Sequence, residues 1–129
     1  MRPTPSLLVI AGASLLAVSA LFAAGPCLAA PVEVYLARLS AQDHFDADGK
    51  RLATVAAIIR QDRANYHKYG LRDPEDEADT FFAGAENRAR LEAFIAQGSV
   101  TPTAARAILN GTPLIVVRVY DTYVDIDVR

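Results

Sequence analysis

Hydrophobic and polar positions alternate with a period of two at the C-terminus of the 129-residue chain. If residues 121–122 form a two-residue turn, the flanking segments pair in a register that places apolar residues opposite one another on one face. The pairs in this register are Ile115 with Val128, Val117 with Ile126, Val119 with Val124, Arg118 with Asp125, and Tyr120 with Tyr123. The pattern predicts an antiparallel β-hairpin over residues 113–129.

A long segment in the middle of the chain has the apolar spacing of an amphipathic helix. It runs from about Gly49 to Tyr69, with Asp48 as the expected N-cap and Gly70 as the residue that ends it. Its apolar stripe consists of Leu52, Val55, Ile58, Ile59 and Tyr66. This is the strongest helix that the sequence predicts.

Two shorter helices are expected before the hairpin. One spans about residues 85–97 and is closed by Gly98. The other has Thr101 as its N-cap and Pro102 at its first position, and it ends at residues 110–111.

Residues 31–39 fit two periodicities. Their apolar positions have the spacing of one helix face, and Pro31 suits the first position of a helix. The alternation of Val32, Val34 and Leu36 fits a strand nearly as well. We favour the helix, and a strand here would be a third strand of the sheet.

The predicted fold class is α+β. An isolated hairpin is marginally stable in water, so its apolar face must lie against the helices. We therefore expect two to four helices packed on a small antiparallel sheet that includes the C-terminal hairpin. Residues 30–129 are predicted to form a single domain, since a chain of about 100 residues fills one hydrophobic core. The helical part spans residues 31–111, and the hairpin spans residues 113–129.

Residues 1–29 are predicted to be a signal peptide. Arg2 precedes an uncharged stretch over residues 7–24, which a Gly-Pro break and small residues follow. Cleavage is expected after Ala29, because Cys27 and Ala29 then occupy the two small-residue positions before the cut. The mature protein would be periplasmic or secreted. One alternative is a lipid-modified Cys27. The other is an uncleaved segment, and only through such a segment would the polypeptide itself enter the membrane.

Charge and sulfur content exclude several functions. All 15 acidic residues but only 12 Lys and Arg residues follow residue 30, so the mature chain is slightly acidic. Nucleic acid is therefore not an expected partner, because it attracts clustered cations. The single Cys lies in the predicted signal peptide, which leaves the mature chain without a thiol nucleophile, a disulfide or a thiolate metal ligand. No cofactor is expected.

Residues 44–50 resemble part of the calcium-binding loop of the EF-hand family, in which alternating acidic side chains converge on one cation. Asp46 and Asp48 are the candidate metal ligands. No register of the twelve-residue loop supplies the bidentate Glu at its last position, however. A turn leading into a helix is the interpretation that we favour.

His44 and His67 are the candidate catalytic residues. Ser40, His44 and Asp46 are of the right types for a nucleophilic triad, but no nucleophile motif surrounds Ser40. A small envelope hydrolase, with a His general base and an Arg-lined anion site, is therefore the alternative function.

The most unusual charge pattern lies at the end of the long predicted helix, where Arg60, Arg63 and His67 are spaced to share one face. The candidate binding residues of this region are Arg60, Arg63, Tyr66, His67 and Arg72. Five acidic residues follow within residues 73–79. The basic face could bind an anion or a partner. Alternatively, the acidic segment could fold back and neutralise it.

Tyr120 and Tyr123 flank the predicted turn on the face away from the apolar residues. They could anchor a partner, or they could pack on each other across the strands. The predicted export signal and the lack of an assembled catalytic set favour a non-enzymatic binding or interaction module in the cell envelope. Its partner would be a protein or an anionic ligand.

Overall fold

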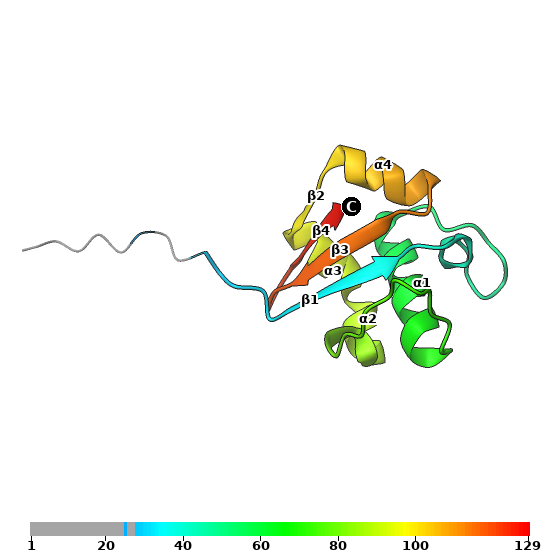
Figure 1. The fold of residues 1–129 in the computed structure, drawn as a ribbon, viewed down its shortest axis with the longest axis horizontal. Coiled ribbons are helices and arrows are strands. Elements are labelled where there is room, and N and C mark those ends of the chain that lie inside the picture. The colour runs from blue at the N-terminus through cyan, green and yellow to red at the C-terminus, as the bar shows by residue number, and fades with distance from the viewer. Residues whose placement is uncertain (1–24, 26–27) are drawn as a thin grey trace, which may run out of the picture.

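The structure, a computed structural model, describes Gly25 and residues 28–129. This part of the chain forms a four-stranded sheet in the order β1-β3-β4-β2, together with four α-helices and two short 3-10 helices (Figure 1). In chain order the elements are β1 (Glu33–Arg38), η1 (Ala41–His44), α1 (Val55–Lys68), η2 (Phe81–Ala83), α2 (Ala85–Ala89), α3 (Leu91–Gln97), β2 (Ser99–Val100), α4 (Pro102–Asn110), β3 (Leu114–Val119) and β4 (Val124–Val128). The predicted α+β class is confirmed. The sheet is mixed rather than antiparallel, because β2 pairs with β4 in parallel.

The predicted signal peptide falls almost entirely outside the described residues and stays a prediction. No helix in the described part of the chain is long and apolar enough to cross a membrane.

The C-terminal hairpin has the predicted register. Ile115 lies opposite Val128, Val117 opposite Ile126, and Val119 opposite Val124. The backbone N–H of Tyr120 donates to the carbonyl oxygen of Tyr123 at 2.9 Å, which closes the turn. The apolar face of the hairpin is buried, apart from Val128 at the end of β4.

Residues 33–38 form a strand, so the predicted helix over residues 31–39 is wrong. Strand β1 pairs antiparallel with β3, from Glu33 opposite Val119 to Arg38 opposite Leu114. Alternate side chains enter the core, so that Tyr35 is fully buried while Val34 is 50% exposed. The strand is favoured because it supplies hydrogen-bond partners for the backbone N–H and C=O groups along the free edge of β3, which is distant in the sequence.

Helix α1 begins at Val55, several residues later than predicted. Thr54 is its N-cap, and the Thr54 hydroxyl accepts a hydrogen bond from the N–H of Ala57 at 3.1 Å. Asp48, the predicted cap, lies instead in a turn before the helix. Gly70 follows the helix with a φ of 68°, in the left-handed conformation predicted for the residue that ends it.

The predicted helix over residues 85–97 consists of two helices, α2 and α3, joined at Arg90. After α3 the chain passes against β4, and a Cβ added to Gly98 would lie 1.7 Å from the carbonyl oxygen of Val124. Helix α4 begins as predicted, with Pro102 at its first position and the Thr101 hydroxyl accepting from the N–H of Ala104 at 3.1 Å.

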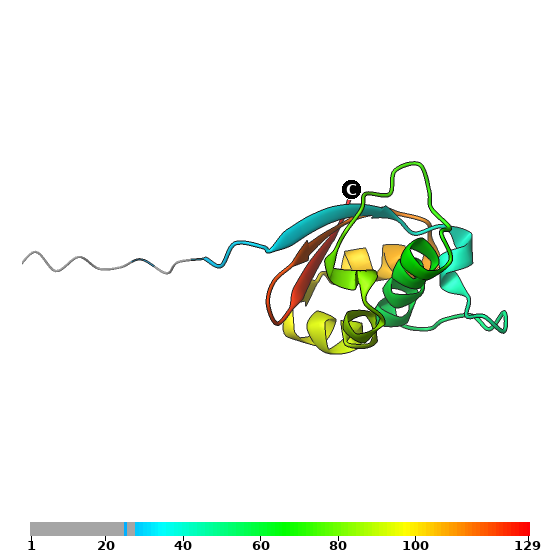
Figure 2. The same cartoon turned by 90° about the horizontal axis from the view of Figure 1, so that it is seen from below.

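The helices lie on one face of the sheet (Figure 2). The core between them contains aromatic and aliphatic side chains from β1, β3, β4 and the helices. Its fully buried members include Tyr35, Leu39, Ile58, Ile59, Phe82, Leu91, Ile108, Ile115 and Val117. In the described part of the chain, no helix covers the opposite face of the sheet.

Candidate functional site

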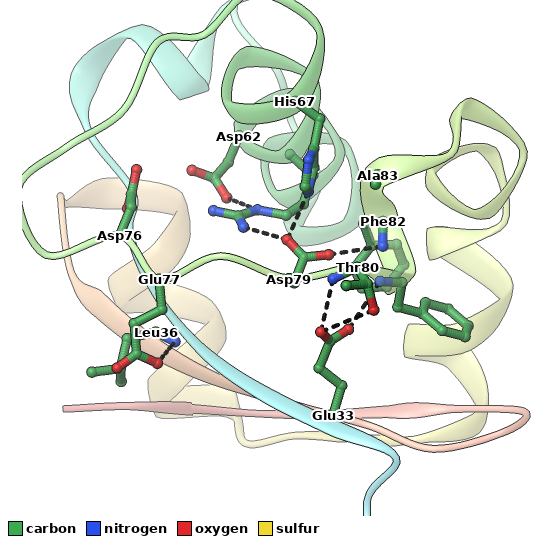
Figure 3. Close-up of polar contacts among 12 residues, drawn as sticks. Glu33, Leu36, Asp62, His67, Asp76, Glu77, Asp79, Thr80, Phe82 and Ala83 are labelled. Carbon is green, nitrogen blue, oxygen red and sulfur yellow. Dashed lines mark hydrogen bonds and ion pairs between the residues drawn. The ribbon is translucent and has the colours of Figure 1, made fainter.

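Arg63 lies on α1, and its side chain is completely buried. Its guanidinium donates from Nε to Asp62 Oδ2 and from Nη1 to Asp79 Oδ1, each at 2.7 Å (Figure 3). Asp79 belongs to the acidic segment that follows α1. The predicted basic face is therefore interrupted, because Arg63 points into the protein and holds the acidic segment against α1.

Aromatic rings enclose the same guanidinium. The Arg63 Cζ atom lies 4.5 Å from the ring centroid of Tyr35 and 4.6 Å from that of Tyr66. Arg72 stacks on Tyr66 as well, with its Cζ 4.2 Å from the ring centroid. The structure thus brings together four of the predicted binding residues, Arg63, Tyr66, His67 and Arg72, as parts of one packed cluster.

Burial sets the protonation of this cluster. It raises the pKa of the Asp62 carboxyl to about 7, and the adjacent Arg63 guanidinium offsets that rise only in part. Burial alone lowers the pKa of Arg63, but Asp62 and Tyr35 raise it above its ordinary value, so the guanidinium stays charged. Burial also raises the pKa of the Tyr35 phenol. A carboxyl with a pKa near 7 can exchange a proton near neutral pH, yet Asp62 is only 3% exposed.

His67, one of the two candidate bases, is held by the same network. Its Nε2 lies 2.7 Å from Asp79 Oδ1, and Asp79 Oδ2 accepts the N–H of Phe82 at 2.8 Å. The His67 side chain is 12% exposed. His67 therefore stabilises the attachment of the acidic segment, and little of it is open to a substrate.

The rest of the acidic segment binds the free edge of β1. Glu77 Oε2 accepts the N–H of Leu36 at 2.9 Å, and Asp76 Oδ1 accepts the N–H of Arg38 at 2.8 Å. Glu75 pairs with the Arg38 side chain at 2.8 Å. Of the two interpretations of the basic face, the one in which the acidic segment folds back describes Arg63 and His67 correctly.

His44, the other candidate base, is also enclosed. It is 3% exposed, and its two ring nitrogens lie 2.9 Å from the carbonyl oxygen of Ser40 and 2.8 Å from that of Ile108. Through these two contacts the ring links η1 to the C-terminal end of α4.

Asp46 and Asp48, the candidate metal ligands, lie in a tight turn. The Asp46 carboxylate accepts the N–H groups of Asp48 and Lys50 at 2.9 and 2.8 Å. Gly49 supplies the positive φ of 77° that the turn requires. Within the described residues, no group of three or more His, Cys, Asp or Glu side chains is placed to hold a metal ion.

The open surface of α1 carries Arg60, which lies outside the buried cluster. A hollow of about 210 Å³ separates this surface from α2. Three cationic side chains contribute to its lining: Arg60 and Lys68 from α1, and Arg88 from α2. All of the residues that line this hollow are described, and none is acidic. We call it the basic hollow.

Arg88 occupies a fixed position in the basic hollow. It is 8% exposed, and its Nη1 donates to the carbonyl oxygens of Phe82 and Ala83 at 2.8 and 2.7 Å. In the described part of the chain, none of the three cations forms an ion pair. Among the described residues, no acidic side chain therefore neutralises the positive charge of the basic hollow.

Tyr120 and Tyr123 stack on each other across the hairpin, with ring centroids 4.3 Å apart and an interplanar angle of 14°. This is the cross-strand packing that was one of the two interpretations of the pair. The tip of the β3–β4 hairpin lies at the opposite end of the domain from the loop between η1 and α1 (Figure 1). Neither tyrosine is among the residues that line the basic hollow.

No family model, no curated protein and no solved structure matches the chain. The geometry of the described residues alone defines the candidate site. Sequence reasoning named Arg60 as a binding residue but left Lys68 and Arg88 out of the candidate set, although all three are cations in predicted helices. Lys68 lies eight residues after Arg60 on the same helix, a spacing that could have indicated a shared face.

Proposed function

We propose that this protein is a non-enzymatic binding module that binds an anionic ligand, or an acidic group of a partner protein, in the basic hollow. The observation that carries the proposal is the convergence of Arg60, Lys68 and Arg88 on one hollow whose lining contains no acidic residue. Guanidinium groups bind carboxylates and phosphates through paired hydrogen bonds, and a lysine adds a mobile point charge.

Pre-organisation supports this function. The hydrogen bonds that fix Arg88 are formed before any ligand arrives, so little side-chain freedom is lost at that position on binding. Arg60 and Lys68 are exposed and supply attraction that salt weakens. Binding of an anion should therefore be saturable but sensitive to ionic strength.

The alternative function, a hydrolase, gains no support from the two histidines. Each is engaged in hydrogen bonds within the fold, and neither lines the basic hollow. We also propose that the protein acts in the cell envelope or outside the cell, on the basis of the N-terminal segment. An intact-mass measurement that finds the chain beginning at Ala30 supports export, and retention of residues 1–29 in a cytoplasmic fraction contradicts it.

Calorimetric titration with inorganic phosphate and with citrate, at constant ionic strength, tests the anion site. We expect saturable binding that weakens about tenfold in Arg60→Gln, which corresponds to the loss of about 1.4 kcal/mol. Lys68→Gln should weaken it as well. The matched control is Arg106→Gln, an exposed cation on α4 that does not line the hollow. Binding that is absent, or that all three substitutions weaken equally, contradicts the proposal.

A further inference from the structure

A second hollow adjoins the basic hollow along α1. It has a volume of about 350 Å³ and lies between the first half of α1 and the α2–α3 pair. Arg60, Gln61 and Ala64 line both hollows. The two hollows therefore lie side by side along α1, and together we call them the α1 groove.

The α1 groove has the length of a short extended peptide. Its floor follows α1 from Ala56 to Lys68, which at about 1.5 Å per residue is about 18 Å. An extended chain rises about 3.3 Å per residue, so five or six residues span this length. Small side chains in the lining, including Ala57 of α1 and Ala89 of α2, leave room for the side chains of a bound segment.

Charge divides the groove into two ends. Lys68 and Arg88 line only the basic hollow, Glu92 of α3 lines only the other hollow, and Arg60 lines both. Between them, Gln61 donates its amide N–H to Asn65 at 2.9 Å, so its carbonyl oxygen is the atom that can accept a peptide N–H. A compact anion would occupy only the basic end.

We propose that the α1 groove binds an extended segment of another polypeptide, with an acidic residue at the Lys68 end and a basic residue at the Glu92 end. This inference rests on the proposed function, because the acidic residue occupies the basic hollow. The inference adds to the proposed function the kind of partner, a polypeptide segment, and the direction in which the two charges of that segment lie along the groove. The complementary charges at the two ends select this occupant over an anion without a cationic group.

The probe is a dye-labelled six-residue peptide with glutamate first, lysine last, and alternating leucine and alanine between them. A matched peptide carries glutamine in place of the lysine. Fluorescence anisotropy with the full chain should show tighter binding of the lysine peptide. Glu92→Gln should weaken the lysine peptide three- to tenfold and leave the glutamine peptide unchanged, while Arg60→Gln should weaken both peptides about tenfold.

The outcomes separate the two proposals. If inorganic phosphate binds in a manner that depends on Arg60 but neither peptide binds, the peptide groove is wrong and the anion site stands. If neither phosphate nor peptide binds, both proposals are overturned. If Glu92→Gln weakens the two peptides equally, the proposed orientation is wrong. Because Glu92 is exposed, its replacement should leave the thermal unfolding midpoint unchanged, which checks that the variant folds.

Discussion

Removal of the Arg63 side chain should strongly destabilise the fold, because Arg63→Ala leaves two buried carboxylates without their cation. Breaking a buried ion pair by removing one partner typically costs about 3–5 kcal/mol. The fully buried Arg63 side chain also packs between two tyrosine rings, and a desolvated cation–π contact contributes about 2 kcal/mol. Two features limit the loss: Asp79 retains its contact with His67, and Asp62, whose pKa is raised to about 7, can take up a proton.

We therefore expect the free energy of unfolding to fall by about 3–5 kcal/mol near pH 7, a large part of the stability of a domain of this size. Urea denaturation followed by circular dichroism measures the change. The cost should be smaller at pH 5.5 than at pH 8, since protonation of Asp62 relieves the unpaired charge at the lower pH. Arg60→Ala is the matched control on the same helix, and it should cost less than about 0.5 kcal/mol.

Adding Asp62→Asn and Asp79→Asn to Arg63→Ala separates charge from packing. If the unpaired carboxylates cause the loss, the triple variant recovers more than about 1 kcal/mol of it. A loss below about 1 kcal/mol in Arg63→Ala, or an equal loss at both pH values together with no recovery, would refute the reasoning.

Three further predictions concern stability. Gly98→Ala should lower the free energy of unfolding by more than about 2 kcal/mol in urea denaturation, because its Cβ would overlap the carbonyl oxygen of Val124; a neutral result would contradict that close approach. Thr101→Ala should cost about 1 kcal/mol by loss of the α4 cap, and Thr101→Ser should restore most of it. In the wild type, burial keeps a proton on Asp62 up to about pH 7, whereas the unfolded chain loses it near pH 4, so stability should fall as pH rises between these values. Denaturation across pH 4–8 should show a smaller slope in Asp62→Asn, by at most about 1.4 kcal/mol per pH unit.

The elements that sequence predicted well are those whose stabilising contacts are local. The hairpin register follows from two adjacent segments and the turn between them. Helix α4 follows from Thr101 and Pro102, which act within its first turn. In contrast, residues 31–39 are ambiguous locally, and the pairing of β1 with β3, about 80 residues away in the chain, decides between helix and strand. The parallel pairing of β2 with β4 was missed because it too is a tertiary contact. In addition, β2 has only two residues, which are too few to show an alternating pattern.

The candidate site was predictable in composition but not in arrangement. Spacing placed Arg60 and Arg63 near one face of a helix, but it could not show that Arg63 would be buried. That burial depends on Asp79 and on Tyr35, which lie 16 residues later and 28 residues earlier in the chain. Arg88 was left out of the candidate set because its role depends on how α2 packs beside α1, which is again a tertiary contact.

The acidic segment explains why a chain of negative net charge retains a basic hollow. Its carboxylates form hydrogen bonds and ion pairs within the fold. Glu77 and Asp76 accept N–H groups along the edge of β1. Asp79 pairs with Arg63 and His67. A carboxylate held in this way protects an exposed strand edge from pairing with another chain, and it is not free to neutralise cations elsewhere. The acidic residues thus stabilise one side of the domain while Arg60 and Lys68, on the open surface of α1, remain without an ion pair among the described residues. The same separation of charge that completes the sheet edge leaves the basic hollow without a neutralising carboxylate among the described residues, as the proposed binding of an acidic group requires.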